Sequence, residues 1–140
     1  MKKRVTGIGG VFFKSKNPKL TKEWYSKHLG IESDKYGSKF LWNSTNTEAE
    51  QMGTTVWSPM ESDTKYYAPS EREFMINYRV ENLVALLAEL KTEGVEQIGE
   101  MESFEYGKFA WIMDPDGTKI ELWEPANESL FHEPPFVKSE

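Results

Sequence analysis

The pattern of apolar and polar residues near the start of the chain predicts a strand followed by a helix. Residues 5–13 contain glycines but end in three consecutive apolar residues, which is typical of a strand. Asn17 suits the N-cap of a helix, and Pro18 suits the first helical position. Apolar side chains then recur at a spacing of four on a stripe that includes Trp24. Gly30 is expected to end this helix.

The second half of the chain repeats this order. Residues 74–80 predict a strand, Asn82 is the expected N-cap of a helix, and Gly94 is expected to end it. The two caps are 65 positions apart and the two terminating glycines are 64 apart, as are Gly53 and Gly117. Three further strands are expected after each helix. The spacing therefore predicts a tandem duplication of one βαβββ module.

This repeat defines the expected domain organisation and an α+β fold class. We expect a single domain over residues 1–125, followed by a tail at 126–140. Within the domain we expect module 1 at about 5–58, a polar linker at about 59–72 and module 2 at about 73–125.

Composition and charge exclude several classes of function. The 17 Lys and Arg residues are outnumbered by 23 Asp and Glu, and the net charge of -6 opposes nucleic-acid binding. No apolar run approaches the roughly 20 residues that span a bilayer, and the N-terminal residues are too polar for a signal peptide. We therefore expect a cytoplasmic protein with no membrane partner. The absence of cysteine excludes disulfides, thiolate metal sites and a cysteine nucleophile.

Two motifs resemble the vicinal oxygen chelate superfamily, which includes glyoxalase I, extradiol dioxygenases and the bleomycin and fosfomycin resistance proteins. The first is Trp24-Tyr25 followed by Leu-Gly-Ile at 29–31, and the second is DPDGTKIEL at 114–122. The Asp-Pro-Asp-Gly segment is also favourable for a tight turn. The resemblance covers about residues 5–125. It implies two tandem βαβββ modules with curved mixed sheets that form a shared cleft.

The superfamily usually holds a divalent metal at four positions, one in the first and one in the last strand of each module. In this sequence those positions map to Gly10, Trp57, Met75 and Glu121. Only Glu121 can ligate such a metal, because glycine has no side chain, tryptophan only donates a hydrogen bond and a thioether is a soft, weak ligand. We therefore expect no cofactor, and a divalent metal is disfavoured.

Strand alternation predicts which side chains line the cleft, because residues two apart share one side of a sheet. Glu121 is the candidate catalytic base, and Asn77 is the candidate hydrogen-bond partner that orients it. A carboxylate among aromatic side chains loses hydration unless a cation or donor compensates. The pocket favours a small aromatic or cationic ligand. The expected substrate-binding residues are Phe12, Thr55, Trp57, Met75, Arg79 and Trp123.

Three functions remain open at this stage. The first is a metal-independent, glyoxalase-like lyase or isomerase that uses Glu121 as general base. The second is a non-catalytic protein that sequesters a small molecule, as bleomycin resistance proteins do. The third, which is less favoured, is a metal-dependent lyase or dioxygenase with unrecognised ligands. A homodimer is also expected from the resemblance. Tyr66-Tyr67 in the linker either cap the pocket as a lid or anchor a loop.

Overall fold

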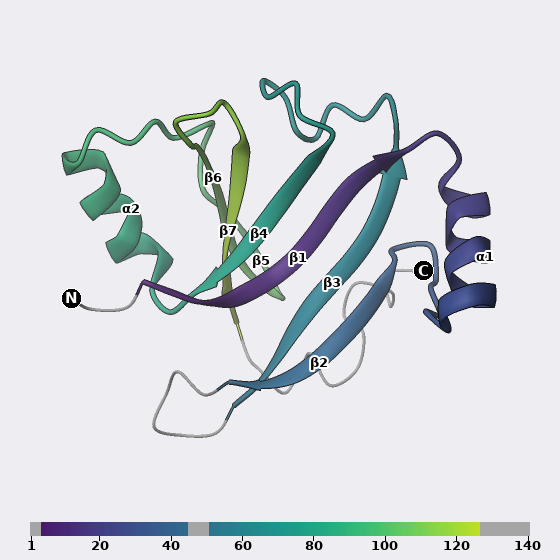
Figure 1. Ribbon diagram of the computed structural model, residues 1–140. Coiled ribbons are helices and arrows are strands. Elements are labelled where there is room, and N and C mark those ends of the chain that lie inside the picture. The colour runs from purple at the N-terminus through teal and green to yellow at the C-terminus, as the bar shows by residue number, and fades with distance from the viewer. Residues whose placement is uncertain (1–3, 45–50, 127–140) are drawn as a thin grey trace.

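The computed structural model describes residues 4–44 and 51–126, and these residues form an α+β fold with one mixed sheet of seven strands. The strand order is β2-β3-β1-β4-β7-β6-β5 (Figure 1). This arrangement is consistent with paired βαβββ modules. The elements are β1 (Val5–Ser15), α1 (Pro18–Leu29), β2 (Ser38–Ser44), β3 (Gln51–Glu61), β4 (Phe74–Val80), α2 (Leu83–Thr92), β5 (Glu102–Phe104), β6 (Gly107–Met113) and β7 (Lys119–Pro125).

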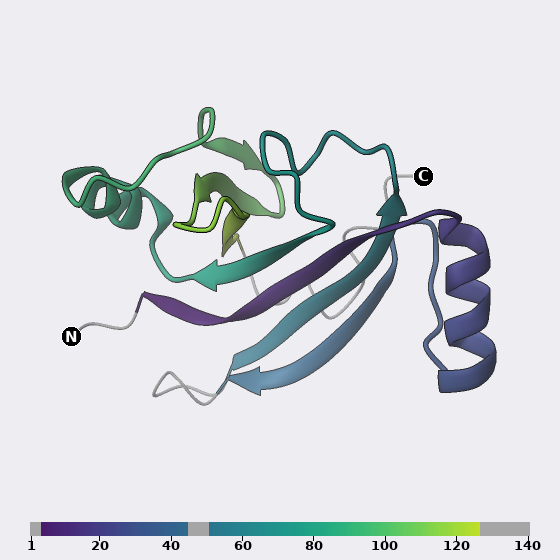
Figure 2. The same ribbon diagram turned by 45° about the horizontal axis from the view of Figure 1, so that its top comes forward.

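The two halves of the chain meet at the middle of the sheet. The first strand of each half, β1 and β4, pair antiparallel with each other. On the outer side of each, the last strand of the same half pairs in parallel, β3 with β1 and β7 with β4. The helices α1 and α2 lie at opposite ends of the molecule in both views (Figures 1 and 2). The repeat in the sequence therefore corresponds to an approximate symmetry in the order of the strands.

The predicted helix caps are confirmed. The side chains of Asn17 and Asn82 each accept a hydrogen bond from a backbone amide three residues later, at 3.2 and 3.0 Å. Gly30 is the C-cap of α1 and has a left-handed backbone with φ of 72°. The C-cap of α2 is Glu93, and Gly94 follows it with φ of 82°.

The prediction of three strands after each helix is wrong for the first half. In the second half, α2 is followed by β5, β6 and β7, whereas α1 is followed only by β2 and β3. An isolated bridge between Asp34 and Gly37 stands where a third strand was expected. The connection after the helix is shorter in the first half, residues 30–37 against 93–106.

One pair of glycine landmarks was also matched wrongly. Gly117 lies in the turn before β7 with φ of 81°, whereas Gly53 lies within β3 and has no positive φ. The structurally equivalent pair is Gly37 and Gly107, which have φ of 116° and 137°. A Cβ atom there would lie 2.2 or 2.4 Å from a carbonyl oxygen of the last strand in the same half. Both positions therefore require glycine for the same two reasons.

The two helices contribute differently to the core. Leu83 and Leu86 of α2 are buried against Val80, Ala110 and Leu122 of the sheet. In contrast, α1 has no buried residue, and its predicted apolar stripe is exposed. The described part of the chain contains no helix long and apolar enough to cross a membrane.

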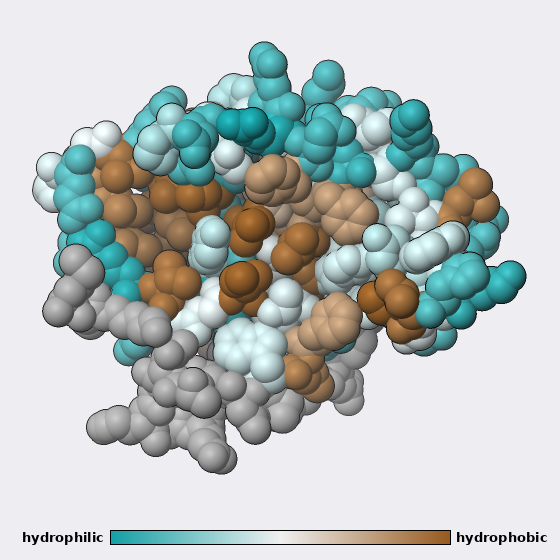
Figure 3. Space-filling view, in the orientation of Figure 1, coloured by the Kyte–Doolittle hydropathy of each residue, from teal (hydrophilic) through white to brown (hydrophobic). Residues whose placement is uncertain are grey.

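A second cluster of buried side chains lies apart from the cluster under α2, and it is rich in aromatic rings. Its members are Tyr67, Met75, Phe109, Trp111 and Trp123. On the face seen in Figure 3, apolar side chains gather in the middle and hydrophilic residues line the upper edge. The tail predicted at 126–140 lies, apart from its first residue, outside the described residues.

Candidate functional site

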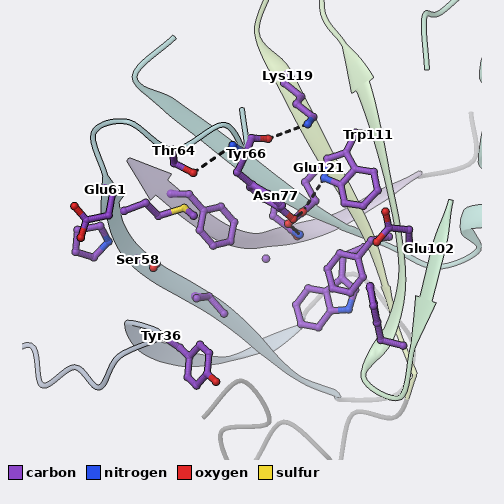
Figure 4. Close-up of a pocket in the computed structure, with 18 of the residues that line it drawn as sticks. Tyr36, Ser58, Glu61, Thr64, Tyr66, Asn77, Glu102, Trp111, Lys119 and Glu121 are labelled. Atoms are coloured by element: carbon purple, nitrogen blue, oxygen red, sulfur yellow. Dashed lines mark hydrogen bonds between the residues drawn. The ribbon is translucent and has the colours of Figure 1, made fainter. Parts of the chain in front are cut away.

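A pocket of about 1020 Å³ opens above the aromatic cluster (Figure 4). It is lined by residues of α1 and of every strand except β2, and by the connection between β3 and β4 at residues 62–73. Residues 35–36, 98–100 and 106, in other connections, also line it. Phe12, Phe109 and Trp123 supply apolar surface, whereas Asn77 and Glu121 supply buried polar groups. Concave apolar surfaces with a few fixed polar groups are typical of small-molecule sites.

The Glu121 carboxylate is the chemical centre of this pocket. The residue is only 2% exposed. Its Oε1 accepts a hydrogen bond from Asn77 Nδ2 at 2.7 Å, and its Oε2 accepts one from Trp111 Nε1 at 2.8 Å and one from the Tyr66 hydroxyl. Three donors from three different segments therefore compensate for the hydration that the carboxylate loses on burial.

Strand register explains why these groups meet. Asn77 lies beside Glu121 in the parallel β4–β7 pair, and Trp111 lies opposite Glu121 in the antiparallel β6–β7 pair. Residues at matched positions on neighbouring strands share a face, so all three side chains point to one side of the sheet. The turn before β7 sets this register, because Asp114 Oδ1 accepts from the amides of Asp116 and Thr118, both at 2.9 Å.

A glycine in β1 makes space for the amide of Asn77. The strand has a register shift between Ile8 and Gly10, which places Gly9 against the pocket. A Cβ atom on Gly9 would lie 2.3 Å from Asn77 Oδ1 and 2.9 Å from the Trp123 ring. Asn77 Oδ1 is buried and has no hydrogen-bond partner among the described residues. Gly9 therefore serves the packing of the site.

Tyr66 brings the connection between β3 and β4 into the pocket. Burial, and then the negative charge of Glu121, raise the pKa of its hydroxyl far above the ordinary value, so it remains protonated. Lys119 Nζ donates to the Tyr66 carbonyl oxygen at 2.8 Å and lies 5.6 and 5.7 Å from the ring centres of Tyr66 and Trp111. Burial lowers the pKa of Lys119, and the charge of Glu121 opposes that shift.

The adjacent tyrosine has a different environment. Tyr67 is 1% exposed and belongs to the aromatic cluster under the pocket. Its neighbour Tyr66 is 40% exposed, although its hydroxyl reaches Glu121. The first tyrosine of the pair thus contacts the pocket, and the second anchors the connection.

Four of the eight predicted site residues line the pocket, namely Phe12, Asn77, Glu121 and Trp123. Met75 does not, because it is fully buried in the aromatic cluster. Arg79 does not line it either. Its guanidinium carbon lies 5.5 Å from the ring centre of Trp42 and 5.2 Å from that of Trp123.

The prediction that Thr55 and Trp57 of β3 face the pocket was wrong. The ring of Trp57 lies against Phe13 of β1 and Tyr25 of α1, with its centre 5.5 Å from the first ring and 4.9 Å from the second. Trp57 does not line the pocket. Thr55 accepts a hydrogen bond from Trp42 Nε1 instead. The β3 residues that line the pocket include Val56 and Ser58, because they pair with the inward-facing residues of β1. Alternation shows that residues two apart share a face, but only the register with β1 shows which face of β3 lines the pocket.

Sequence analysis missed two of the donors to Glu121. Trp111 could have been predicted. A tight turn at 114–118 joins two antiparallel strands and pairs residues that are equally far from the turn, which places Trp111 opposite Glu121. Tyr66 lies in an irregular connection, and the sequence singled it out only as one of a tyrosine pair that either caps the pocket or anchors a loop. Its contact with Glu121 depends on the tertiary fold.

The residues present do not fit a divalent metal. Of the four positions used by the superfamily, Gly10 has no donor, Trp57 is packed against α1 and Met75 is in the core. Among residues 4–44 and 51–126, no group of three or more His, Cys, Asp or Glu side chains could hold a metal ion. Glu121 is instead bound by hydrogen-bond donors, which do not coordinate cations.

Comparisons with known proteins identify the fold. The chain matches no protein-family model and no curated protein. Among solved structures, methylmalonyl-CoA epimerase from Mycobacterium tuberculosis is similar at 22% identity and a TM-score of 0.58, covering 93% of this chain and 95% of that chain. Methylmalonyl-CoA epimerase from Streptomyces coelicolor, in complex with 2-nitronate-propionyl-CoA, has 15% identity and a TM-score of 0.61, covering 88% and 99%.

A further match is a structure described as NAD-dependent benzaldehyde dehydrogenase from Legionella pneumophila, at 13% identity and a TM-score of 0.52, covering 83% of this chain and 97% of that chain. The epimerases belong to the vicinal oxygen chelate superfamily. The resemblance found in the sequence is therefore confirmed at the level of the fold. At these identities the similarity shows the fold alone.

Proposed function

We propose that this protein binds a small organic molecule in the pocket and that Glu121 accepts a proton from it, in a metal-independent enzyme of the lyase or isomerase type. The observation that carries the proposal is a buried carboxylate at the wall of an aromatic pocket, held by three donors. Such a group is positioned before substrate arrives, which is the main requirement for a general base.

The donors assign distinct roles to their side chains. The Trp111 indole can only donate a hydrogen bond, so it fixes Oε2 as an acceptor. The Tyr66 hydroxyl covers the other lone pair of Oε2, and once the substrate displaces it that lone pair can take up the proton. Lys119, a cation at the same wall, stabilises negative charge left on the substrate. The proton therefore moves from the substrate to Oε2 of Glu121, which Trp111 continues to hold.

A non-catalytic sequestering protein is the second candidate. It is favoured by the aromatic lining, since Phe12, Phe109 and Trp123 can hold a flat molecule without reacting with it. In this case Glu121 serves only as a hydrogen-bond acceptor. The two candidates differ in one measurable respect: an enzyme converts the ligand chemically, and a sequestering protein releases it unaltered.

The test begins with thermal-shift screening of acyl thioesters, phenols, aromatic acids and aromatic amines. Compounds that stabilise the protein are incubated in D₂O, and proton NMR records deuterium uptake or product. We expect Glu121→Gln to reduce the rate by roughly 10²–10⁴-fold. The substitution preserves the fold, because the Gln amide can donate to Asn77 Oδ1 once the Asn77 amide flips. Full activity in this variant would overturn the catalytic proposal.

The matched control is Glu96→Gln, which removes a carboxylate from an exposed position outside the pocket lining. Its rate is expected to equal that of the unmodified protein. If a compound stabilises the unmodified protein and Glu96→Gln at a ratio of one to one, and neither protein catalyses deuterium uptake or forms product, the result would instead support sequestration. If no compound class stabilises the protein, the pocket is not a small-molecule site and both candidates fail.

A further inference from the structure

The side chain of Tyr66 occupies the pocket as a ligand would. Its hydroxyl donates to Glu121 Oε2, and its ring meets the Trp111 ring edge to face, with centres 6.4 Å apart and an interplanar angle of 87° (Figure 4). Lys119 Nζ lies 5.6 Å from the ring centre. A phenol is thus already bound to the buried carboxylate, and it belongs to the protein itself.

The contacts that hold the connection do not depend on this ring. The backbone of Tyr66 is fixed by hydrogen bonds to Thr64 Oγ1 at 3.2 Å and from Lys119 Nζ at 2.8 Å. Tyr67, next in the chain, anchors the connection in the core. Tyr66 itself is 40% exposed. Rotation of its side chain therefore frees the carboxylate without moving the backbone.

The groups that remain after such a rotation select for a particular chemistry. Oε2 of Glu121 would keep its bond from Trp111 and offer the lone pair that the Tyr66 hydroxyl had used. The walls beside it are flat rings. The ammonium of Lys119 already lies at this wall, so a second cation is disfavoured by like-charge repulsion, whereas a neutral O–H donor is not.

We propose that Tyr66 is a resident competitor for Glu121 and that the ligand of this pocket is a phenol, whose own hydroxyl replaces that of Tyr66 on the carboxylate. This inference rests on the proposed binding function of the pocket and narrows its ligand class. Tyr66 is then a specificity-determining residue, because a ligand must bring an equivalent donor to displace it. A ligand without a donor leaves the buried carboxylate with an unused lone pair.

Calorimetry with two small probes tests the inference. The probes are 4-methylphenol and 4-methylanisole, which differ only in a methyl group that removes the hydroxyl donor. Tyr66→Phe abolishes the competing hydroxyl but keeps the ring. We expect 4-methylphenol to bind this variant roughly tenfold or more tightly than the unmodified protein, because a hydrogen bond to a charged group no longer has to be broken. In this variant 4-methylanisole is expected to bind more weakly than 4-methylphenol, because it brings no donor to the carboxylate.

Three further arms complete the design. Tyr66→Ala opens the same position without any ring and should show the same preference for the phenol. Glu121→Gln should reduce that preference, because the acceptor loses its charge. Tyr78→Phe removes a hydroxyl from the cluster under α2, away from the pocket lining, and should change neither affinity.

Two results would overturn the inference. One is equal affinity of the two probes for Tyr66→Phe, which would mean that the ligand needs no hydroxyl donor to Glu121. The other is failure of 4-methylphenol to bind any variant while another compound class stabilises the unmodified protein, which would refute the phenol and leave the proposed binding function intact. Failure of every class in the thermal screen would instead refute the binding function.

Discussion

At the scale of single residues, the site is organised around a carboxylate that three hydrogen-bond donors hold in place. Trp111 donates only, and Asn77 Nδ2 donates only, so both bonds require acceptor oxygens on Glu121. Removing one donor leaves a buried negative charge with fewer partners. Such a loss costs more than the hydrogen bond itself contributes.

Trp111→Phe tests this cost. We expect the free energy of unfolding to fall by roughly 2–4 kcal/mol, from the lost bond to a charged group and the smaller ring. Urea unfolding followed by circular dichroism measures it. Trp24→Phe, at a residue that is 54% exposed, should change stability by less than about 0.5 kcal/mol. If Trp111→Phe costs the same in a Glu121→Gln background, the bond to the carboxylate is not the cause.

At the scale of elements, α1 and α2 have similar caps but different attachment. The N-cap asparagines and terminating glycines were predictable, because capping depends on a few neighbouring residues. The side of α1 that contacts the sheet was not, because Leu20, Trp24 and Leu29 are exposed and Tyr25 makes the contact with Trp57. Local pattern determines where a helix begins and ends, whereas the sheet determines which side is covered.

Hydrogen exchange should separate the two helices. Amides in the middle of α1 are expected to exchange faster than those in α2, because α1 buries no residue and α2 buries Leu83 and Leu86. Mass spectrometry of peptides from each helix measures the rates. Equal protection at low protein concentration would contradict this expectation. Protection of α1 that grows with concentration would indicate that its exposed face, which includes Leu20 and Trp24, is covered by a second copy.

The strands show the same limit of prediction. The inward positions of β4 and β7 followed from alternation, because the turn at 114–118 and the apolar residues under α2 fix their faces. The inward positions of β3 did not, because they depend on its parallel register with β1. Tyr66 could not be predicted from any periodicity. The chemistry of the site was therefore more predictable than its full lining.

At the scale of the whole molecule, stability and the tyrosines are linked through pH. Burial raises the pKa of Tyr67, and the charge of Glu73 adds to the shift; burial likewise raises that of Tyr66. The ordinary value for tyrosine is 10.0. A group whose pKa is higher in the folded state than in the unfolded state stabilises the fold when the pH is below the unfolded-state pKa. That contribution is lost as the pH rises above it.

We therefore expect the free energy of unfolding to fall steeply above about pH 10, and the fall to be smaller in a Tyr66→Phe, Tyr67→Phe double variant. Urea unfolding at pH 8 and pH 11 measures the difference. At pH 8, Tyr67→Phe alone should be close to neutral, because its buried hydroxyl has no hydrogen-bond partner among the described residues. Parallel pH profiles for both proteins would contradict the assignment.

The pairing of β1 with β4 joins two halves that contribute unequally to the pocket. Asn77, Trp111 and Glu121 all come from the second half, whereas the first half contributes surface through residues such as Phe12 and Val56. Substitutions at Phe12 or Val56 can therefore change the shape of the pocket, whereas a side chain at Gly9 would press on Asn77 Oδ1. One half of such a fold can acquire new ligand contacts while the other half keeps the reactive group.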